Sequence, residues 1–229
     1  MIHGLPGSIR DYRYLAAALA NRARIIRIEL PGFGETPAST GRDTTITARG
    51  QMALSAIEAL GFERFLVVGH SMGGTVATHV AVNAASRVTG LGLLSSVGMR
   101  LHKMLRRFPA GAFKPLVDLP VLGGGVRRLM RAGLIAGGFS PQTTLDDAAQ
   151  SVRVLGALDL DTHRHNVRAL NVPTLLAWAE DDAFIEPAIF REFAPQLPAG
   201  PRLTWPRGGH NIQKSHAVEI ADALAAMLS

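Results

Sequence analysis

The sequence predicts an α/β fold in which a mostly parallel, doubly wound sheet carries a helical cap as an insertion. Short runs rich in Ile, Leu and Val alternate with segments of helical periodicity over most of the 229 residues. Hydrophobic residues make up 47% of the chain, which is enough for a sizeable core. The alternation stops between Gly98 and Leu170, and this break predicts the cap.

Five short apolar segments are the predicted strands. Several lack strict polar alternation, as expected for strands that helices cover on both faces. In chain order they are RIIRIEL (24–30), RFLVVGH (64–70), VTGLGLLSS (88–96), PTLLAWAE (173–180) and RLTWP (202–206).

Five segments between these strands have helical periodicity. They are Ile9–Ala20, Thr45–Leu60, Thr75–Ala85, Pro187–Leu197 and His216–Leu228. Gly61 follows one of these helices where a terminating glycine is common, and Pro187 suits the first turn of another. The core is therefore predicted over residues 1–97 and 171–229, and the cap over 98–170.

The cap segment is too apolar for a solvated linker, so it is predicted to fold as helices. Its apolar side chains have two interpretations, the lining of an acyl pocket or the packing core of the cap, and packing is favoured. The residues concerned are Leu101, Met104, Leu105, Phe108, Phe113 and Met130.

The net charge of +6 lies entirely in this part of the chain. Residues 97–170 hold 11 Lys and Arg against 5 Asp and Glu, and the remaining residues hold 13 against 13. Such a segment can attract nucleic acid, an anionic membrane or an acidic substrate. No aromatic or motif pattern for nucleic-acid binding accompanies the charge, so a solvated helical face is favoured and no nucleic acid is expected. One further hypothesis is that Arg106 and Arg107 select carboxylate-bearing substrates.

Several functional classes are excluded. The chain has no cysteine, which rules out disulfides, thiolate metal sites and cysteine nucleophiles. No run of about 18 apolar residues occurs, so no membrane span is expected. The N-terminus does not read as a secretory signal, and a cytoplasmic location is expected. Neither a metal-ligand cluster nor a dinucleotide fingerprint is present, so no metal or organic cofactor is expected.

The stretch VVGHSMGG (67–74) places Ser71 where a buried strand stops and a helix begins. A nucleophile on so sharp a turn needs small neighbours, and Gly69 and Gly73 supply them. The turn exposes the serine oxygen at the carboxyl edge of the sheet. It also puts the N–H of Met72 at a helix N-terminus, where negative charge is stabilised. The alternative role for Ser71 is a helix N-cap.

A serine hydroxyl is a poor nucleophile without a base, and His210 is the candidate among eight histidines. It lies on a glycine-containing loop after the last strand, at the same edge of the sheet as Ser71. The cluster Glu180–Asp182 follows the strand before it, where a carboxylate can orient the imidazole. The chain order Ser71, Asp182, His210 is the order that this chemistry takes on such a sheet.

A glycine-rich turn, HGLPGS (3–8), precedes the first predicted helix. Its backbone N–H at Leu5 can face the N–H of Met72. Two such donors aimed at a tetrahedral oxyanion supply a major share of acyl-transfer catalysis.

Five motifs of this chain resemble, in their order and spacing, the motifs of the α/β-hydrolase family. They are HGLPGS, ELPGFGETP, GHSMGG, AWAEDDAFIEP and GGH. They are similar to its small esterases and C–C bond hydrolases with a helical cap. The resemblance implies Ser71 as nucleophile, His210 as base, and Leu5 and Met72 as oxyanion donors. It places the acid at Asp182, three residues after Ala179. Family members usually have glycine at the position of Ala179, so Asp181 stays a second choice. Dehalogenases and epoxide hydrolases have aspartate at the nucleophile position, and the serine argues against both.

The start of the chain departs from this pattern, because only Met1 and Ile2 precede the first turn. The strand expected between residues 24–30 and 64–70 is therefore missing. Unless something covers them, two buried strand edges are then unpaired, which favours self-association as a homodimer. A misassigned start, a truncated chain and a sheet that closes differently stay open as explanations.

The expected function is a serine hydrolase that cleaves small carboxylic esters through an acyl-enzyme. Two alternatives stay open. One is C–C bond hydrolysis or a lyase reaction on the same residues, and the other is a non-catalytic, truncated member of the family.

Overall fold

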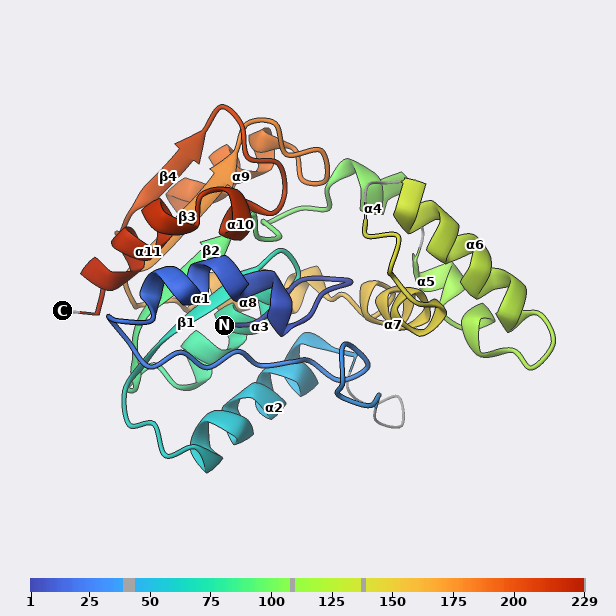
Figure 1. Ribbon diagram of the computed structural model, residues 1–229, viewed down its shortest axis with the longest axis horizontal. Coiled ribbons are helices and arrows are strands. Elements are labelled where there is room, and N and C mark those ends of the chain that lie inside the picture. The colour runs from blue at the N-terminus through green and yellow to red at the C-terminus, as the bar shows by residue number, and fades with distance from the viewer. Residues whose placement is uncertain (39–43, 108–109, 137–138, 229) are drawn as a thin grey trace.

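The structure, a computed structural model, describes residues 1–38, 44–107, 110–136 and 139–228. Its described core contains a four-stranded parallel sheet in which each strand pairs with the next in sequence. The strands are β1 (Phe65–His70), β2 (Val88–Leu94), β3 (Thr174–Ala179) and β4 (Arg202–Trp205) (Figure 1). The predicted α/β class is confirmed, and β3 is buried along its whole length as a strand covered on both faces should be.

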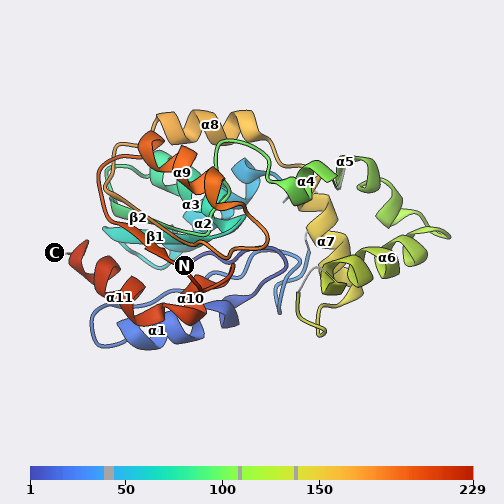
Figure 2. The same ribbon diagram turned by 90° about the horizontal axis from the view of Figure 1, so that it is seen from above.

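Helices cover both faces of this sheet (Figure 2). One face carries α2 (Ile46–Ala59), α3 (Gly73–Asn83), α8 (Leu160–Arg168), α9 (Pro187–Phe193) and η3 (Ala194–Gln196). The other carries η1 (Ile9–Tyr12), α1 (Arg13–Leu19), α10 (Ile212–Ser215) and α11 (Ala217–Ala226). Two apolar clusters therefore form the core, one on each face of the sheet.

Local sequence signals set several helix ends as predicted. The Thr45 hydroxyl accepts the Ala48 N–H at 3.1 Å and caps α2, and Gly61 follows this helix with φ of 69°. Pro187 opens α9. Helix α3 begins at Gly73, two residues earlier than predicted, so it starts directly after the turn that holds Ser71.

The prediction of a strand over 24–30 is wrong. Only Ile28 pairs there, through an isolated bridge to Ile2, and Ile2 also bridges to Gly69 on β1. A strand persists only where a neighbour pairs along its length. Here the neighbouring segment is Met1 and Ile2, and within residues 24–30 it bonds to Ile26 and Ile28 only.

The segment predicted to form the cap projects beyond the end of the sheet (Figures 1 and 2). It contains α4 (Lys103–Arg107), α5 (Ala110–Phe113), η2 (Leu116–Asp118), α6 (Gly123–Ala136) and α7 (Leu145–Leu155). Helix α8 lies inside the predicted cap range but packs against α3, where Asn166 Nδ2 is 3.3 Å from His79 Nδ1. The division at residues 98 and 170 stays a prediction.

The cap has a small apolar core of its own. Met130 belongs to this core and Phe113 packs against it, as the packing interpretation predicts. Leu105 is also buried, whereas Leu101 is 36% exposed. Phe108 and the side chain of Met104 lie outside the described residues.

Many of the basic side chains of residues 97–170 face carboxylates. Arg127 pairs with Asp118 at 3.4 Å and with Asp146 at 3.2 Å, and Arg164 pairs with Asp161 at 2.8 Å. Exposed pairs of this kind stabilise a fold only slightly. They do reduce the free positive charge, which agrees with a solvated helical face. Among the described residues, no helix combines the length and the apolar character needed to cross a bilayer.

Acid is expected to destabilise this fold because it protonates histidines that are buried in the neutral form. His163 Nε2–H donates to the Val97 carbonyl at 3.2 Å, and the ring lies against Phe193. Burial lowers the pKa of His163 to about 4 from its ordinary 6.5. Between these pH values the unfolded chain binds a proton that the folded chain does not. Stability is therefore full above pH 6.5 and falls with pH by about 1.4 kcal/mol per unit for each such histidine.

Thermal denaturation at about pH 7.5 and about pH 5 measures this loss. His163→Gln retains a donor for the Val97 carbonyl and removes the titration, so its Tm should fall less on acidification than that of the parent chain. Equal falls in the two proteins would contradict the assignment of acid sensitivity to His163.

Candidate active site

Ser71 lies on the tight turn between β1 and α3. Its φ of 53° is in the left-handed region, which side chains rarely adopt. The Ser71 N–H donates to the Leu94 carbonyl and its own carbonyl accepts the Gly74 N–H, both at 3.0 Å, so the turn is held from two sides. A Cβ at Gly69 would lie 2.4 Å from the Gly73 carbonyl oxygen, so this close approach requires glycine. The predicted sequence of strand, turn and helix is thus present.

The His210 and Asp182 side chains form a buried pair. His210 Nδ1 is 2.8 Å from Asp182 Oδ2, and the Asp182 side chain is fully buried. The other carboxylate oxygen accepts the backbone N–H groups of Phe184 at 2.8 Å and Ile185 at 3.0 Å. Burial raises the pKa of Asp182. The hydrogen bond from His210, the charge of His210 and these two N–H donors act in the opposite direction, and together they hold that pKa below its usual range. The carboxylate is therefore fixed and ionised, and it directs the Nδ1–H of His210.

Asp181, the second choice for the acid, lies elsewhere. Its Oδ1 accepts the Gly209 N–H at 2.7 Å, and Gly209 has φ of 63°. Asp181 therefore holds the backbone of the His210 loop and Asp182 holds the imidazole. The sequence left both carboxylates open because they are adjacent at the end of the same strand.

His70 has a structural role that its sequence position alone did not show. Its Nε2 is 2.8 Å from the His210 carbonyl oxygen, and because a carbonyl only accepts, Nε2 carries the proton. The two rings lie 4.9 Å apart. Burial, and then the charge of His210, lower the pKa of His70 to about 3, so it is neutral near pH 7. His70 thereby joins the end of β1 to the His210 loop.

The turn at residues 3–8 packs directly on Ser71. Ile2 anchors it, donating to the Val68 carbonyl at 2.8 Å and accepting the His70 N–H at 3.1 Å. His3 Nδ1–H donates to the Gly4 carbonyl at 2.8 Å, and its Nε2 accepts the Leu30 N–H at 3.0 Å. A Cβ at Gly4 would lie 2.9 Å from the Ser71 Cβ.

Leu5 and Met72 therefore lie on two backbone segments that meet at Ser71. Met72 directly precedes the first turn of α3, and its side chain is buried. Two N–H donors from such segments are the components of an oxyanion site.

The sequence pattern of the alpha/beta hydrolase family matches residues 1–223. The chain belongs to the alpha/beta hydrolase family. It is 28% identical over its whole length to the dihydrolipoyllysine-residue acetyltransferase component of an acetoin cleaving system from Pseudomonas putida, of which it spans 62%. It is 24% identical, again over its whole length, to an sn-1-specific diacylglycerol lipase from Mus musculus, of which it covers 80%.

The fold of this alpha/beta hydrolase is also similar to solved structures. One is an enol-lactonase from Burkholderia xenovorans LB400, with a TM-score of 0.78 and 20% sequence identity. The similarity covers 99% of this chain and 89% of that one.

The cap of this alpha/beta hydrolase extends to the His210 ring through aromatic contacts. Phe184 lies 5.1 Å from the His210 ring, and Phe139 of the cap lies 4.7 Å from Phe184. His102, just before α4, is buried, and burial lowers its pKa to about 4. These contacts could not be predicted from the sequence, because no local pattern shows how the predicted cap lies over the sheet.

Glu186 anchors the first cap helix. Its two carboxylate oxygens accept the Lys103 N–H, each at 3.0 Å, and Arg106 lies 3.6 Å from one of them. Arg106 also donates to the Leu101 carbonyl at 3.1 Å. The hypothesis that Arg106 and Arg107 bind a substrate carboxylate stays a prediction, with Arg106 already engaged and the Arg107 side chain outside the described residues.

A wide cleft lies between the core and the cap. It has a volume of about 910 Å³, and its walls are the turn at Pro6–Ser8, the loop around Gly32–Ala38 and the cap between Phe139 and Arg153. The cleft adjoins the turn that carries Leu5, because Pro6, Gly7 and Ser8 of that turn line it. Within the described residues, no group of His, Asp and Glu side chains has a metal-binding arrangement.

Proposed function

We propose that this alpha/beta hydrolase is a serine hydrolase that cleaves carboxylic ester bonds of small substrates through an acyl-enzyme. The observation that carries the proposal is the buried pair of Asp182 and His210, held beside the strained turn of Ser71 at one edge of the sheet. A serine nucleophile needs a base, and the base needs an orienting acid.

In the proposed mechanism, the Ser71 oxygen attacks the ester carbonyl and His210 Nε2 takes the serine proton. Asp182 keeps the other imidazole proton on Nδ1 and stabilises the imidazolium that forms. The N–H groups of Leu5 and Met72 stabilise the oxyanion. His210 then protonates the leaving alcohol, and in the second half it activates the water that releases the acid.

The surroundings and the relatives support an ester as substrate. The base is flanked by Phe184, which contacts Phe139 of the cap, so the acyl or alcohol part meets aromatic side chains. Diacylglycerol and an enol lactone both contain carboxylic ester bonds, and these are named in the mouse relative and in the Burkholderia structure.

The acyl-enzyme is the most direct test. We expect p-nitrophenyl acetate, butyrate and octanoate to be hydrolysed, with rapid release of one p-nitrophenol per chain before the steady state. After acid quenching, peptide mass analysis should find the acyl group on the peptide that contains Ser71. The dependence of kcat/KM on the length of the acyl chain then measures the size of the acyl site. Hydrolysis with acylation at another residue, or none, would contradict the proposal.

A further inference from the structure

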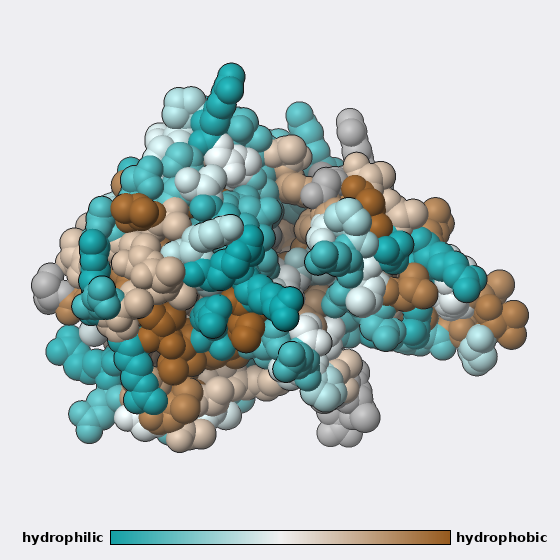
Figure 3. Space-filling view, viewed as in Figure 1, coloured by the Kyte–Doolittle hydropathy of each residue, from teal (hydrophilic) through white to brown (hydrophobic). Residues whose placement is uncertain are grey.

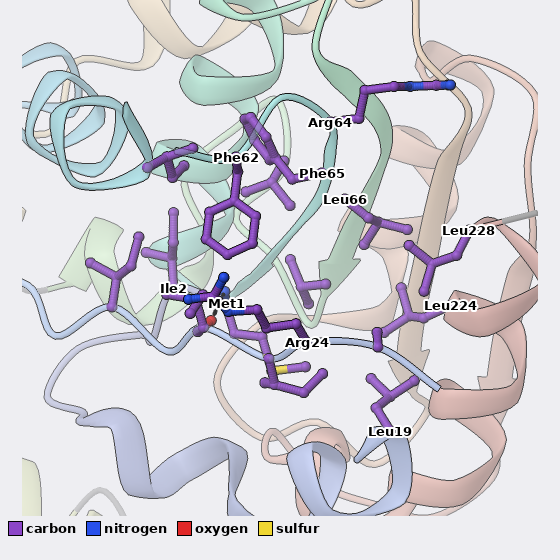
Figure 4. A pocket seen from close by; sticks show the side chains of 17 residues that line it. Met1, Ile2, Leu19, Arg24, Phe62, Arg64, Phe65, Leu66, Leu224 and Leu228 are labelled. Atoms are coloured by element: carbon purple, nitrogen blue, oxygen red, sulfur yellow. Dashed lines mark hydrogen bonds between the residues drawn. The ribbon is translucent and has the colours of Figure 1, made fainter. Parts of the chain in front are cut away.

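Apolar side chains reach the surface between α1 and α2 and again at the far end of the predicted cap (Figure 3). The first group adjoins a slot of about 280 Å³ beside β1, which residues such as Phe62 and Leu224 line (Figure 4). These side chains pack in the two apolar clusters of the core. The surface between α1 and α2 is therefore an extension of the core, whereas the far end of the predicted cap needs a separate explanation.

Four exposed side chains form an apolar tip at this far end. They are Leu119, Val121, Leu122 and Leu129. Val121 is 89% exposed, and Leu122 and Leu129 are 63% and 62% exposed. Leu129 follows Leu122 by two helical turns along α6, so both side chains lie on the same side of this helix. None of the four belongs to an apolar cluster of the described residues, although Met130 is buried in the cluster of the predicted cap.

The charge beside the apolar tip is positive. From Leu119 to Leu145 the chain has three arginines and no acidic residue. The charge of Arg127 is offset by the two carboxylates described above. Arg131 donates to two backbone carbonyls, which carry no net charge. Arg128 is exposed, and no carboxylate of the described residues pairs with it. Arg128 and Arg131 therefore leave uncompensated positive charge on the helix that carries Leu129.

The shape of the apolar tip favours a lipid surface over a protein partner. A stable protein interface uses about 20 residues or more on each side, whereas the tip offers four apolar side chains where the predicted cap projects from the sheet (Figures 1 and 2). Acyl chains of a bilayer surround such side chains without a complementary shape. Anionic headgroups supply oxygen acceptors for the neighbouring arginines. Nucleic acid would match the charge, but its phosphate backbone offers no apolar surface to the tip.

We propose that the apolar tip and Arg128 form a docking site for an anionic lipid surface. The four apolar side chains enter the boundary between headgroups and acyl chains, and the arginines stay at the level of the phosphates. Such docking is reversible, and salt weakens it because salt screens the charges. The docking site lies apart from Ser71 and His210, so it extends the proposed function and does not rest on it.

The test measures binding of the 229-residue chain to vesicles of ether-linked lipids, which contain no carboxylic ester. One set of vesicles is phosphatidylcholine alone, and the other contains about 30% phosphatidylglycerol. At about 0.05 M salt the partition coefficient should be about tenfold or more higher for the anionic vesicles. At about 0.5 M salt most of this difference should disappear.

Two matched pairs of variants locate the docking site. Val121→Glu should lower the partition coefficient for anionic vesicles by about tenfold or more, because a charge enters the apolar boundary. Val218→Glu is its control, since Val218 is 62% exposed on α11 of the core, and binding should not change. Arg128→Gln should lower the coefficient by about fivefold. Arg168→Gln, at an exposed arginine on α8, should leave it unchanged.

Tryptophan at the same two positions reports which of them meets the lipid. On anionic vesicles, Val121→Trp should shift its emission to the blue by about 10 nm, and acrylamide should quench it about threefold less. Val218→Trp should show neither change. The Tm of every variant without vesicles should match that of the parent chain, because all the substituted side chains are exposed.

Several outcomes would overturn the proposal. Equal binding by Val121→Glu and Val218→Glu would exclude the apolar tip as the docking site. No binding, or equal binding to neutral and anionic vesicles, would exclude an anionic surface as its occupant. Self-association without vesicles that Val121→Glu abolishes would assign the tip to a second copy of the chain. Because ether-linked lipids contain no carboxylic ester, failure of the proposed ester hydrolysis does not affect this test.

Discussion

Replacement of Ser71 by alanine should lower kcat/KM for p-nitrophenyl butyrate by about 10⁴-fold or more. The variant has no oxygen to form the acyl-enzyme, and water attacking without covalent catalysis is the only remaining route. The substitution leaves the backbone bonds from Ser71 to Leu94 and Gly74 available, so Tm should change little.

The matched control for this variant is Ser55→Ala. Ser55 is an exposed serine on α2, so its loss should leave both activity and Tm near those of the parent chain. Retention of most of the activity by a folded Ser71→Ala protein would show that the hydrolysis does not pass through this serine.

Asp182→Asn and Asp181→Asn should differ by about a thousandfold or more in kcat. In Asp182→Asn the amide oxygen still accepts the N–H groups of Phe184 and Ile185, so its NH₂ faces His210 Nδ1. An NH₂ donor there requires an unprotonated Nδ1, which puts the imidazole proton on Nε2 and prevents it from accepting the serine proton.

Asp181→Asn keeps an oxygen that accepts the Gly209 N–H, so its kcat should fall by about tenfold at most. Steady-state kinetics of both variants at neutral pH, with Tm as the control for folding, measures the difference. Similar losses in the two variants, or a larger loss in Asp181→Asn, would contradict the assignment of Asp182 as the acid.

The sheet and the candidate triad could be predicted because each depends on short-range patterns. Apolar runs in the sequence predicted β1 to β4, and the carboxyl ends of parallel strands lie at one edge. That alone places Ser71, Asp182 and His210 on the same side. Residues 24–30 have the composition of a strand, but a strand also needs a partner along its length, and only Ile28 pairs there, with Ile2.

The choice between Asp181 and Asp182 could not be made from the sequence. The two residues are adjacent and chemically identical, and the loop conformation after β3 decides which one faces the imidazole. The contact of Phe139 with Phe184 was out of reach for a related reason. It depends on how the predicted cap packs against the core, and the hydrophobic periodicity of either segment contains no information about that packing.

The hydrogen bond from His70 to the His210 carbonyl joins the loop of the proposed base to the end of β1, next to the proposed nucleophile. The sheet therefore sets how these two residues are aligned. The Ser71 turn is bonded to Leu94 at the end of β2, and Ser95 is bonded to Ala177 of β3, so these strand ends form one continuous backbone network. The predicted cap meets this site through side chains, with Phe139 against Phe184 and Phe184 against His210. Under the proposed mechanism we therefore expect substitutions in the predicted cap to alter which esters are accepted while proton transfer between Ser71 and His210 is retained, so a collection of cap variants is a direct route to new substrate ranges.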